Sequence, residues 1–371
     1  MRSRLSRLLV PVSVLILLLA GVFIRIMTNR PPESEVITAG KKLAEAQLAR
    51  APDYAKGSFR EAGIYYDSAM VEWRRQNERF ILFRNYKEVS RFARTSVTNS
   101  EQAIQRARES IVDTEALLGL RLENLAHTIG NFDKHFRGFP IHIDHQDSLA
   151  RCRLLYTESL QAYYSKNYST CQSMLVSVDA TIHAVSAHYT EKLQDYFDAY
   201  PQWAAMVEKS ISLSRKDHIP VLVVDKIARI LYVYTNGRIL REYPVELGSN
   251  WVGDKMQQGD KSTPEGHYKI LEKKKNGQTS YHRAFLLDYP NDADKKRFTL
   301  NKKNGIINQN ASIGNLIEIH GSGGKGTDWT DGCVALRDSH MEELFALCPV
   351  GTRVTIVGST MPLNRLTIPL Q

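Results

Sequence analysis

The chain has 371 residues, more than one ordinary compact domain holds, so two domains with shorter flanking segments are expected. Hydrophobic residues make up 43% of it, which excludes a wholly disordered protein. The net charge of +9 suits an anionic partner such as a wall polymer or anionic lipid. Nucleic-acid binding is not expected, because the basic residues are spread out and form no block with interleaved aromatic residues.

An uncharged run near the start of the chain predicts a membrane anchor. Three arginines precede residues 8–24, and Arg25 follows them. As a helix this run extends over about 25 Å, just enough for a bilayer core. A cleaved signal peptide is the alternative, but large apolar residues follow Ala20-Gly21, the only small pair at its end. We therefore expect residues 1–30 to be an uncleaved, single-pass anchor in the inner membrane, with the rest of the chain extracytoplasmic (periplasmic).

Residues 31–212 are expected to form an α-helical hairpin region that acts as a stalk or bundle. Few glycines or prolines interrupt it, and small residues recur at helical spacing between Ala39 and Ala69. Pro52-Asp53 is typical of a helix start, and Gly138-Phe139-Pro140 of an interruption.

A basic-Asn-Tyr step occurs twice in this region, at residues 84–86 and 166–168. It indicates two related helical hairpins, which could serve as a simple stalk or as a surface for a protein partner. Cys152 and Cys171 lie on either side of the second step, poorly placed to face each other. Buried thiols are favoured for them, and a disulfide stays open.

The pattern changes near residue 212, where short β-rich runs begin. Strands are expected over residues 221–225, 229–234, 238–247, 266–272, 283–289, 316–320 and 353–357, with a hairpin turn at Asn236-Gly237. One helix is expected, over residues 339–347, with a capping box formed by Ser339 and Glu342. The predicted fold class is α + β with several domains: residues 213–359 form a mostly β sandwich with one late helix, and residues 360–371 form a tail.

A histidine and a cysteine in glycine-rich surroundings are the candidate catalytic residues. His320 ends a short apolar run, a glycine-rich loop follows, and Gly332-Cys333 opens the next apolar run. Only a few per cent of a free thiol is ionised at neutral pH, so an imidazole that takes the proton and returns it to a leaving amine would activate Cys333. Gly332 has no side chain, so a substrate carbonyl could approach the backbone closely there. The N–H groups around Gly332 and Cys333 could then stabilise the oxyanion that forms from that carbonyl.

This segment resembles the L,D-transpeptidase catalytic domain, the YkuD-type fold, over about residues 219–358. That family carries a His-Gly pair, a variable loop and then Ser/Thr-His-Gly-Cys; here the matching segments are residues 320–321 and 330–333. The Thr-Pro-Glu-Gly step at residues 263–266 and the Tyr-Pro-Asn step at residues 289–291 are also similar to the family's pattern.

The resemblance implies a reaction on peptidoglycan stem peptides. Cys333 would attack the L,D-peptide bond after the third residue of a stem tetrapeptide, form a thioester and release D-Ala, and an amine would then take the acyl group. His320 would act as base and then acid, and the carbonyl of Gly321 would orient it. No metal and no other cofactor is implied. Substrate contacts are expected from the neighbouring residues Trp329, Thr330, Asp331 and Arg337.

Two positions depart from the family's pattern. Asp331 replaces the usual histidine before Gly-Cys, and Ala335 replaces a frequent arginine, with Arg337 two residues further on. A carboxylate beside the nucleophile disfavours the thiolate unless it points away. Hydrolysis, as an L,D-carboxypeptidase or endopeptidase that releases D-Ala or wall-bound protein, and an inactive peptidoglycan-binding scaffold are therefore the alternatives to transpeptidation.

Overall fold

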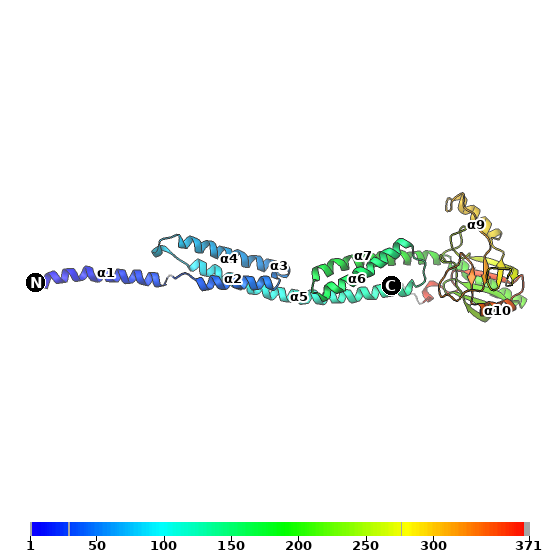
Figure 1. Ribbon diagram of the computed structural model, residues 1–371, viewed down its shortest axis with the longest axis horizontal. Helices are drawn as coiled ribbons and strands as arrows, with labels where there is room; N and C mark the ends of the chain where they lie inside the picture. Colours follow the sequence, from blue (N-terminus) through cyan, green and yellow to red (C-terminus); the bar gives the residue numbers. More distant parts are fainter. Residues whose placement is uncertain (1, 29, 276, 367–371) are drawn as a thin grey trace. The chain divides into compact units, whose positions relative to one another are not determined.

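The computed structural model describes residues 2–28, 30–275 and 277–366, as a series of helices followed by a mixed β domain (Figure 1). The chain divides into two compact units. The first holds the chain up to Glu123 together with Ser159–Gln172, and the second holds Asn124–Glu158 and the chain from Ser173 onward. Residues 367–371 of the expected tail lie outside the described residues.

The region before the sheet is helical, as its sequence predicts. Its helices are α1 (Arg2–Thr28), α2 (Glu33–Leu48), α3 (Ala51–Tyr54), α4 (Lys56–Asn77), α5 (Lys87–His135), α6 (Ile143–Tyr164), α7 (Tyr168–Phe197) and α8 (Tyr200–Asp217), with the short 3₁₀ helix η1 (Ile81–Phe83) before α5. The expected helix start at Pro52 and the interruption at residues 138–140 are both confirmed.

Alanines form the contacts between helices in the first unit. Ala39 and Ala69 are fully buried beside Val89 and Ala93, so the expected small-residue packing is confirmed there. The repeated basic-Asn-Tyr step lies at the starts of α5 and α7. In both copies the asparagine Oδ1 accepts a backbone N–H, from Lys87 (3.2 Å) and from Thr170 (3.4 Å), and the tyrosine is buried.

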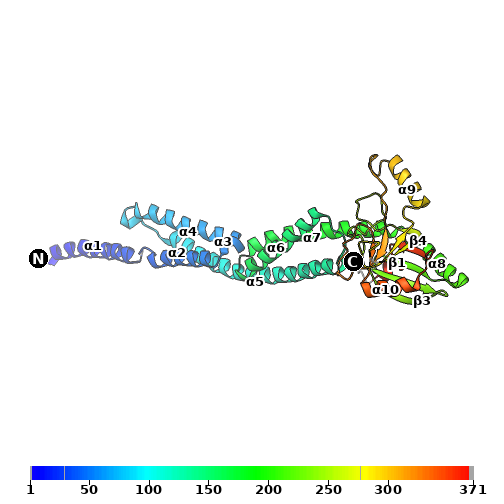
Figure 2. The same cartoon turned by 45° about the vertical axis from the view of Figure 1, so that its right-hand side comes forward.

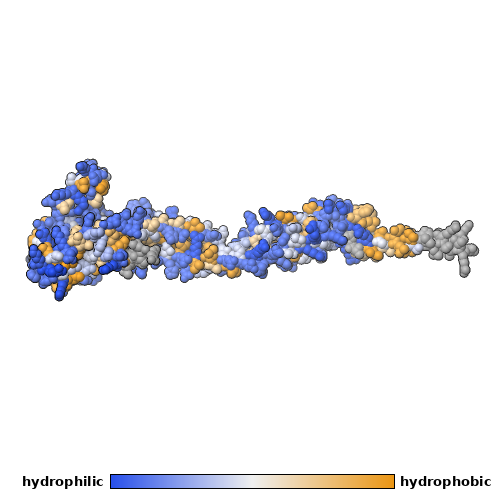
Figure 3. All heavy atoms as spheres, turned by 180° about the vertical axis from the view of Figure 1, so that it is seen from behind, coloured by the Kyte–Doolittle hydropathy of each residue, from blue (hydrophilic) through white to orange (hydrophobic). Residues whose placement is uncertain are grey.

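The prediction of a membrane anchor is wrong. Side chains between Val14 and Ile24 of α1 are apolar and exposed (Figure 3). A membrane span, however, needs about 20 consecutive apolar residues. Within the described residues, none of the helices combines the length and the apolar character needed to cross a membrane. The inner-membrane localisation was inferred from that anchor, so this prediction is wrong as well.

The strands form one eight-stranded sheet in the order β3-β2-β1-β8-β4-β5-β6-β7. Their bounds are β1 (Val221–Asp225), β2 (Ile230–Thr235), β3 (Arg238–Pro244), β4 (Gly266–Lys274), β5 (Ala284–Leu287), β6 (Glu318–His320), β7 (Val334–Ala335) and β8 (Arg353–Val357). β1 pairs in parallel with β8, and β6 with β7, while the other neighbours are antiparallel. The seven expected strands are therefore all present, several with shifted ends.

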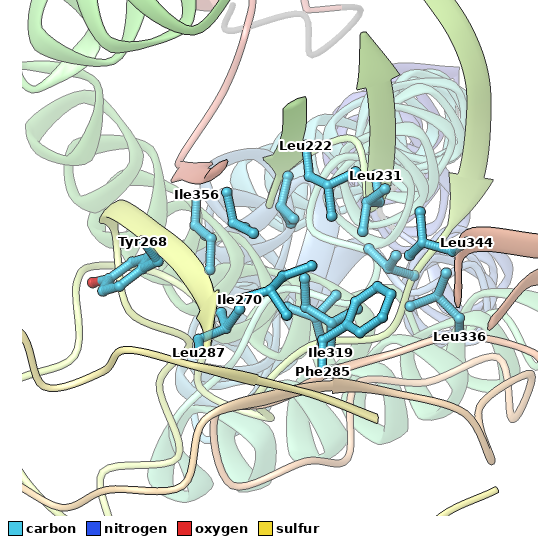
Figure 4. Packing of buried hydrophobic residues seen from close by; sticks show 14 of the residues in the cluster. Leu222, Leu231, Tyr268, Ile270, Phe285, Leu287, Ile319, Leu336, Leu344 and Ile356 are labelled. Atoms are coloured by element: carbon cyan, nitrogen blue, oxygen red, sulfur yellow. The ribbon is translucent and has the colours of Figure 1, made fainter. Parts of the chain in front are cut away.

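Apolar side chains from both ends of this strand order meet in one core (Figure 4). Leu222 and Leu231 lie on the β1–β2 side, Phe285 and Ile319 on the β5–β6 side, and Leu344 of α10 (Asp338–Leu347) closes the core. All of β1 is buried, which fits a central strand with an unbroken apolar sequence. This core holds β6 and β7 rigidly where the candidate catalytic residues emerge.

The expectation of a single helix in this domain is wrong, because α9 (Asp292–Lys303) is present as well as α10. α9 begins with a capping box in which the Asn291 side chain accepts from the N–H of Asp294, and the Asp294 side chain accepts from the N–H of Asn291. The capping box expected for α10 is absent. That helix begins one residue earlier than expected, its N-cap is Arg337 without a side-chain cap, and Asp338 accepts from the N–H of Ser322 instead.

The helix α8 packs against β1 and β8 (Figure 2), although most of its residues precede the expected domain start at residue 213. Trp203 of α8 is buried, and its Nε1 donates to Glu265 Oε2 (2.9 Å). Tyr196 OH donates to Glu265 Oε1 (2.6 Å), and the fully buried Lys226 Nζ pairs with the same oxygen (2.7 Å). A Cβ on Gly358 would lie 2.3 Å from the Trp203 ring, so glycine is required under it.

We expect Trp203→Ala to lower the free energy of unfolding of the sheet domain by about 3–5 kcal/mol, because it leaves a cavity and removes a donor to a buried carboxylate. Urea unfolding followed by circular dichroism measures this, with the exposed neighbour Gln202→Ala as the matched control. Equal stability of the two variants would contradict the described packing of α8.

Candidate active site

The parallel pairing of β6 with β7 brings the two candidate catalytic residues together. Ile319 pairs with Val334, and His320 pairs with Ala335. Cys333 directly precedes β7, and its Sγ accepts from the N–H of Glu318 at 3.4 Å. The cysteine therefore lies beside β6, two positions along from His320.

The imidazole of His320 is buried and held in one orientation. Its Nδ1 lies 2.6 Å from the carbonyl oxygen of Gly321. Because a carbonyl only accepts, Nδ1 carries the proton and Nε2 holds a lone pair. Nε2 is buried and has no hydrogen-bond partner among the described residues. Burial lowers the pKa of His320, so the neutral form dominates near pH 7.

Two aromatic rings enclose this imidazole, and sequence reasoning missed one of them. Tyr281 stacks on His320 with ring centroids 3.5 Å apart and planes within 6° of parallel. Trp329 approaches edge-on at 6.0 Å, and its Nε1 donates to Glu246 Oε2 (2.7 Å). Tyr281 lies in the connection between β4 and β5, where no spacing or motif relates it to the histidine.

The thiol of Cys333 is half-buried and neutral near pH 7. Burial raises its pKa to about 11, opposed in part by the N–H donated from Glu318, while the carboxylate of Glu318 raises it further. Asp331 is exposed and raises this pKa as its position suggested, but it is the smallest of the contributing causes. A thiol that is neutral near pH 7 has to give up its proton before or during any attack, and no hydrogen bond links Cys333 Sγ to His320 Nε2 among the described residues.

Gly332 fills a position that admits no other residue. Its φ is +132°, and a Cβ there would lie 2.6 Å from the carbonyl oxygen of Ser262. On the side where a Gly332 side chain would point, the carbonyl of Ser262 thus occupies the space that was expected to admit a substrate carbonyl. The Gly332 N–H donates to Thr330 Oγ1 (3.2 Å), whereas the Cys333 N–H has no acceptor among the described residues.

The remaining candidates for substrate contact fall into two groups. Thr330 is buried, and its hydroxyl donates to the carbonyl of Cys333 (2.7 Å), so it shapes the turn from inside. Asp331 and Arg337 are exposed. No cluster of three or more His, Cys, Asp or Glu side chains in the described part of the chain could hold a metal ion. All four cysteines are free thiols, and Cys348 is buried in the core.

Comparison with known proteins supports the resemblance over the sheet domain. Residues 219–356 match the YkuD family, described as the L,D-transpeptidase catalytic domain. None of the curated proteins matches the chain. Among solved structures, the Bdellovibrio bacteriovorus protein Bd1075 is 28% identical over 38% of this chain and 48% of its own length, with a TM-score of 0.29.

Two L,D-transpeptidase structures are similar over the same part of the chain. The one from Xylanimonas cellulosilytica is 19% identical over 37% of this chain and 60% of its own, with a TM-score of 0.25. The one from Enterococcus faecium is 16% identical over 37% of this chain and 49% of its own, also with a TM-score of 0.25. This chain thus spans about half to three fifths of these relatives, and the family assignment concerns the sheet domain.

Replacing Gly332 by alanine should lower the free energy of unfolding by more than about 3 kcal/mol, since it adds backbone strain and a clash with the Ser262 carbonyl. Gly326→Ala is the matched control, because Gly326 also has a positive φ (+76°) but open space at its Cβ. It should lose only about 1–2 kcal/mol. Thermal unfolding of both variants gives the comparison, and similar losses would contradict the close approach at Gly332.

Alkylation of Cys333 by iodoacetamide should be slow near neutral pH and rise about tenfold per pH unit up to pH 10, because only the thiolate reacts and the pKa is raised to about 11. Peptide mass spectrometry resolves the rate from that of Cys348, whose pKa of about 12 and full burial should keep it slower throughout. A plateau of the Cys333 rate below pH 8 would show a preformed thiolate and contradict this description.

Proposed function

We propose, because residues 219–356 match the YkuD family of L,D-transpeptidase catalytic domains, that this protein is a peptidoglycan L,D-transpeptidase that acts through a thioester on Cys333. One observation carries the proposal. His320 has its Nδ1 tied to the Gly321 carbonyl and its Nε2 without a partner among the described residues, and Cys333 lies beside the same strand. A nitrogen lone pair without a partner, on the strand next to the thiol, supports His320 as the general base for Cys333.

In the first half-reaction the Cys333 Sγ attacks the carbonyl carbon of the L,D-peptide bond after the third stem residue, and the thiol proton passes to His320 Nε2. The C–N bond then breaks, His320 returns the proton to the leaving D-Ala amine, and a thioester remains. In the second, an acceptor amine attacks the thioester and loses a proton to His320. The C–S bond then breaks, and His320 gives that proton to the leaving sulfur, which restores the thiol.

Two features of the site support the electrostatic part of this mechanism. The Cys333 N–H, without an acceptor among the described residues, is available to the oxyanion of each tetrahedral intermediate. The Gly321 carbonyl stabilises the imidazolium that forms transiently on His320. Gly321 itself is tightly packed, since a Cβ there would lie 2.5 Å from Asp338 Oδ1.

The aromatic enclosure favours transfer to an amine over hydrolysis. Tyr281 covers one face of His320, and Trp329 meets it edge-on. Both rings occupy space next to the imidazole that water would otherwise fill, which limits the activation of water by the same base. Hydrolysis by the same thioester route is the competing outcome that product analysis must distinguish.

The test is to incubate the full chain with purified disaccharide-tetrapeptide and analyse the products by mass spectrometry. We expect cross-linked dimer and released D-Ala, no product from Cys333→Ala, and a rate lowered by about 10²–10⁴ in His320→Ala. Cys348→Ala, which removes a thiol buried in the core, is the control that should keep activity.

The products separate the alternatives. A Cys333-dependent tripeptide without dimer would replace the transferase by an L,D-carboxypeptidase. Absence of any conversion by the unaltered chain would contradict a transpeptidase that uses this donor and would favour the scaffold.

A further inference from the structure

A cavity of about 960 Å³ lies beside the loop that connects His320 to Cys333. One wall comes from the sheet domain and includes Gly324, Ala335 and Arg337. The other comes from residues 137–141, the connection between α5 and α6 in the helical region. Both walls belong to the second compact unit. A segment far from the catalytic domain in sequence therefore borders the same surface as the catalytic loop.

The connection between α5 and α6 is fixed in place by specific contacts. The carbonyl of Gly138 accepts from Arg229 Nη2 (2.8 Å) and from Trp251 Nε1 (2.9 Å). The ring of Phe139 packs edge-on against Trp251, with centroids 5.5 Å apart. Arg137 is therefore held at the cavity, because the sheet domain binds the backbone of the next residue, Gly138.

The acidic groups that line the cavity already have partners. Asp328 Oδ2 pairs with Arg229 (2.9 Å), and Asp328 Oδ1 accepts from the N–H of Leu247 (2.8 Å). Both oxygens of Glu246 are likewise engaged, by the N–H of Gly326 (2.6 Å) and by Trp329 Nε1. The carboxylates of Asp328 and Glu246 are thus neutralised or hydrogen-bonded by other groups of the protein.

Two cationic groups of the cavity are uncommitted. Arg137 and Arg337 both line it and are exposed, and neither guanidinium has an ion-pair or hydrogen-bond partner among the described residues. A guanidinium presents a planar fork of donors that matches a carboxylate. The cavity therefore has a surplus of positive charge suited to a carboxylate-bearing ligand.

We propose that this cavity is a carboxylate subsite for a stem peptide, with Arg137 of the helical region and Arg337 of the sheet domain binding a free carboxylate of that peptide. The inference rests on the proposed function, which brings an acidic peptide to Cys333. It assigns the helical region a part in substrate recognition. Donor and acceptor stems both carry free carboxylates, so the two are separated by experiment.

Binding is measured by calorimetry with the full chain carrying Cys333→Ala, so that no turnover occurs. Adding Arg137→Ala should weaken binding of the disaccharide-tetrapeptide about tenfold, the effect typical of losing a charge-assisted contact. Arg151→Ala is the matched control, because Arg151 is also an exposed arginine of the helical region but does not line the cavity. A tetrapeptide with amidated carboxylates should bind weakly and be insensitive to Arg137→Ala.

Equal binding by the Arg137→Ala and Arg151→Ala proteins, or the same tenfold loss with the amidated peptide, would overturn the subsite. The subsite would also be overturned if the disaccharide-tetrapeptide bound to none of these proteins. With Cys333 intact, slower thioester formation in Arg137→Ala would place the donor in the subsite, and a lower dimer yield alone would place the acceptor there. Arg137-dependent binding without turnover would support the subsite while contradicting the transpeptidase.

Discussion

The hydrogen bond between His320 Nδ1 and the carbonyl of Gly321 is the interaction on which the proposed chemistry depends. It fixes the proton on one nitrogen of a buried ring and leaves the other nitrogen as a base. Burial keeps both His320 and the Cys333 thiol neutral near pH 7. In the proposed reaction, proton transfer between them accompanies the attack, and the N–H donors near the thiol act on charge that develops only during that reaction.

The rest of the domain holds this pair in register. β6 and β7 are short, but they end a sheet whose core is continuous from β1 to α10. Gly332 allows the turn before Cys333 to pass against the Ser262 carbonyl. Near the middle of the strand order, between β1 and β4, the largely buried side chain of Glu265 joins Lys226 to Tyr196 and Trp203. Removing one partner of such a buried pair is strongly destabilising, so this group of contacts joins α7 and α8 firmly to the sheet.

Local sequence patterns were sufficient where local physics decides the structure. Unbroken or alternating apolar runs identified the strands, and the strand-His-Gly and Gly-Cys-strand context singled out His320 and Cys333, which lie on and directly before the paired strands β6 and β7. α9 was missed although its Asn291–Asp294 capping box is visible in the sequence. The prediction of a membrane anchor was wrong because it treated a short apolar run as a membrane span, and none of the described helices is long and apolar enough to form one. Tyr281, Glu265 and Arg137 reach their places only through tertiary contacts, which no spacing along the chain encodes.

The central claim is that Cys333 becomes covalently acylated by a stem peptide with His320 as its base. Mass spectrometry of the intact protein, quenched in acid shortly after mixing with tetrapeptide donor and without added acceptor, tests it most directly. The account predicts a mass gain equal to the donor less D-Ala, located on the peptide that contains Cys333 and strongly reduced in His320→Ala. Product formation by the unaltered chain with no such adduct at any quench time, or an adduct on another residue, would contradict it.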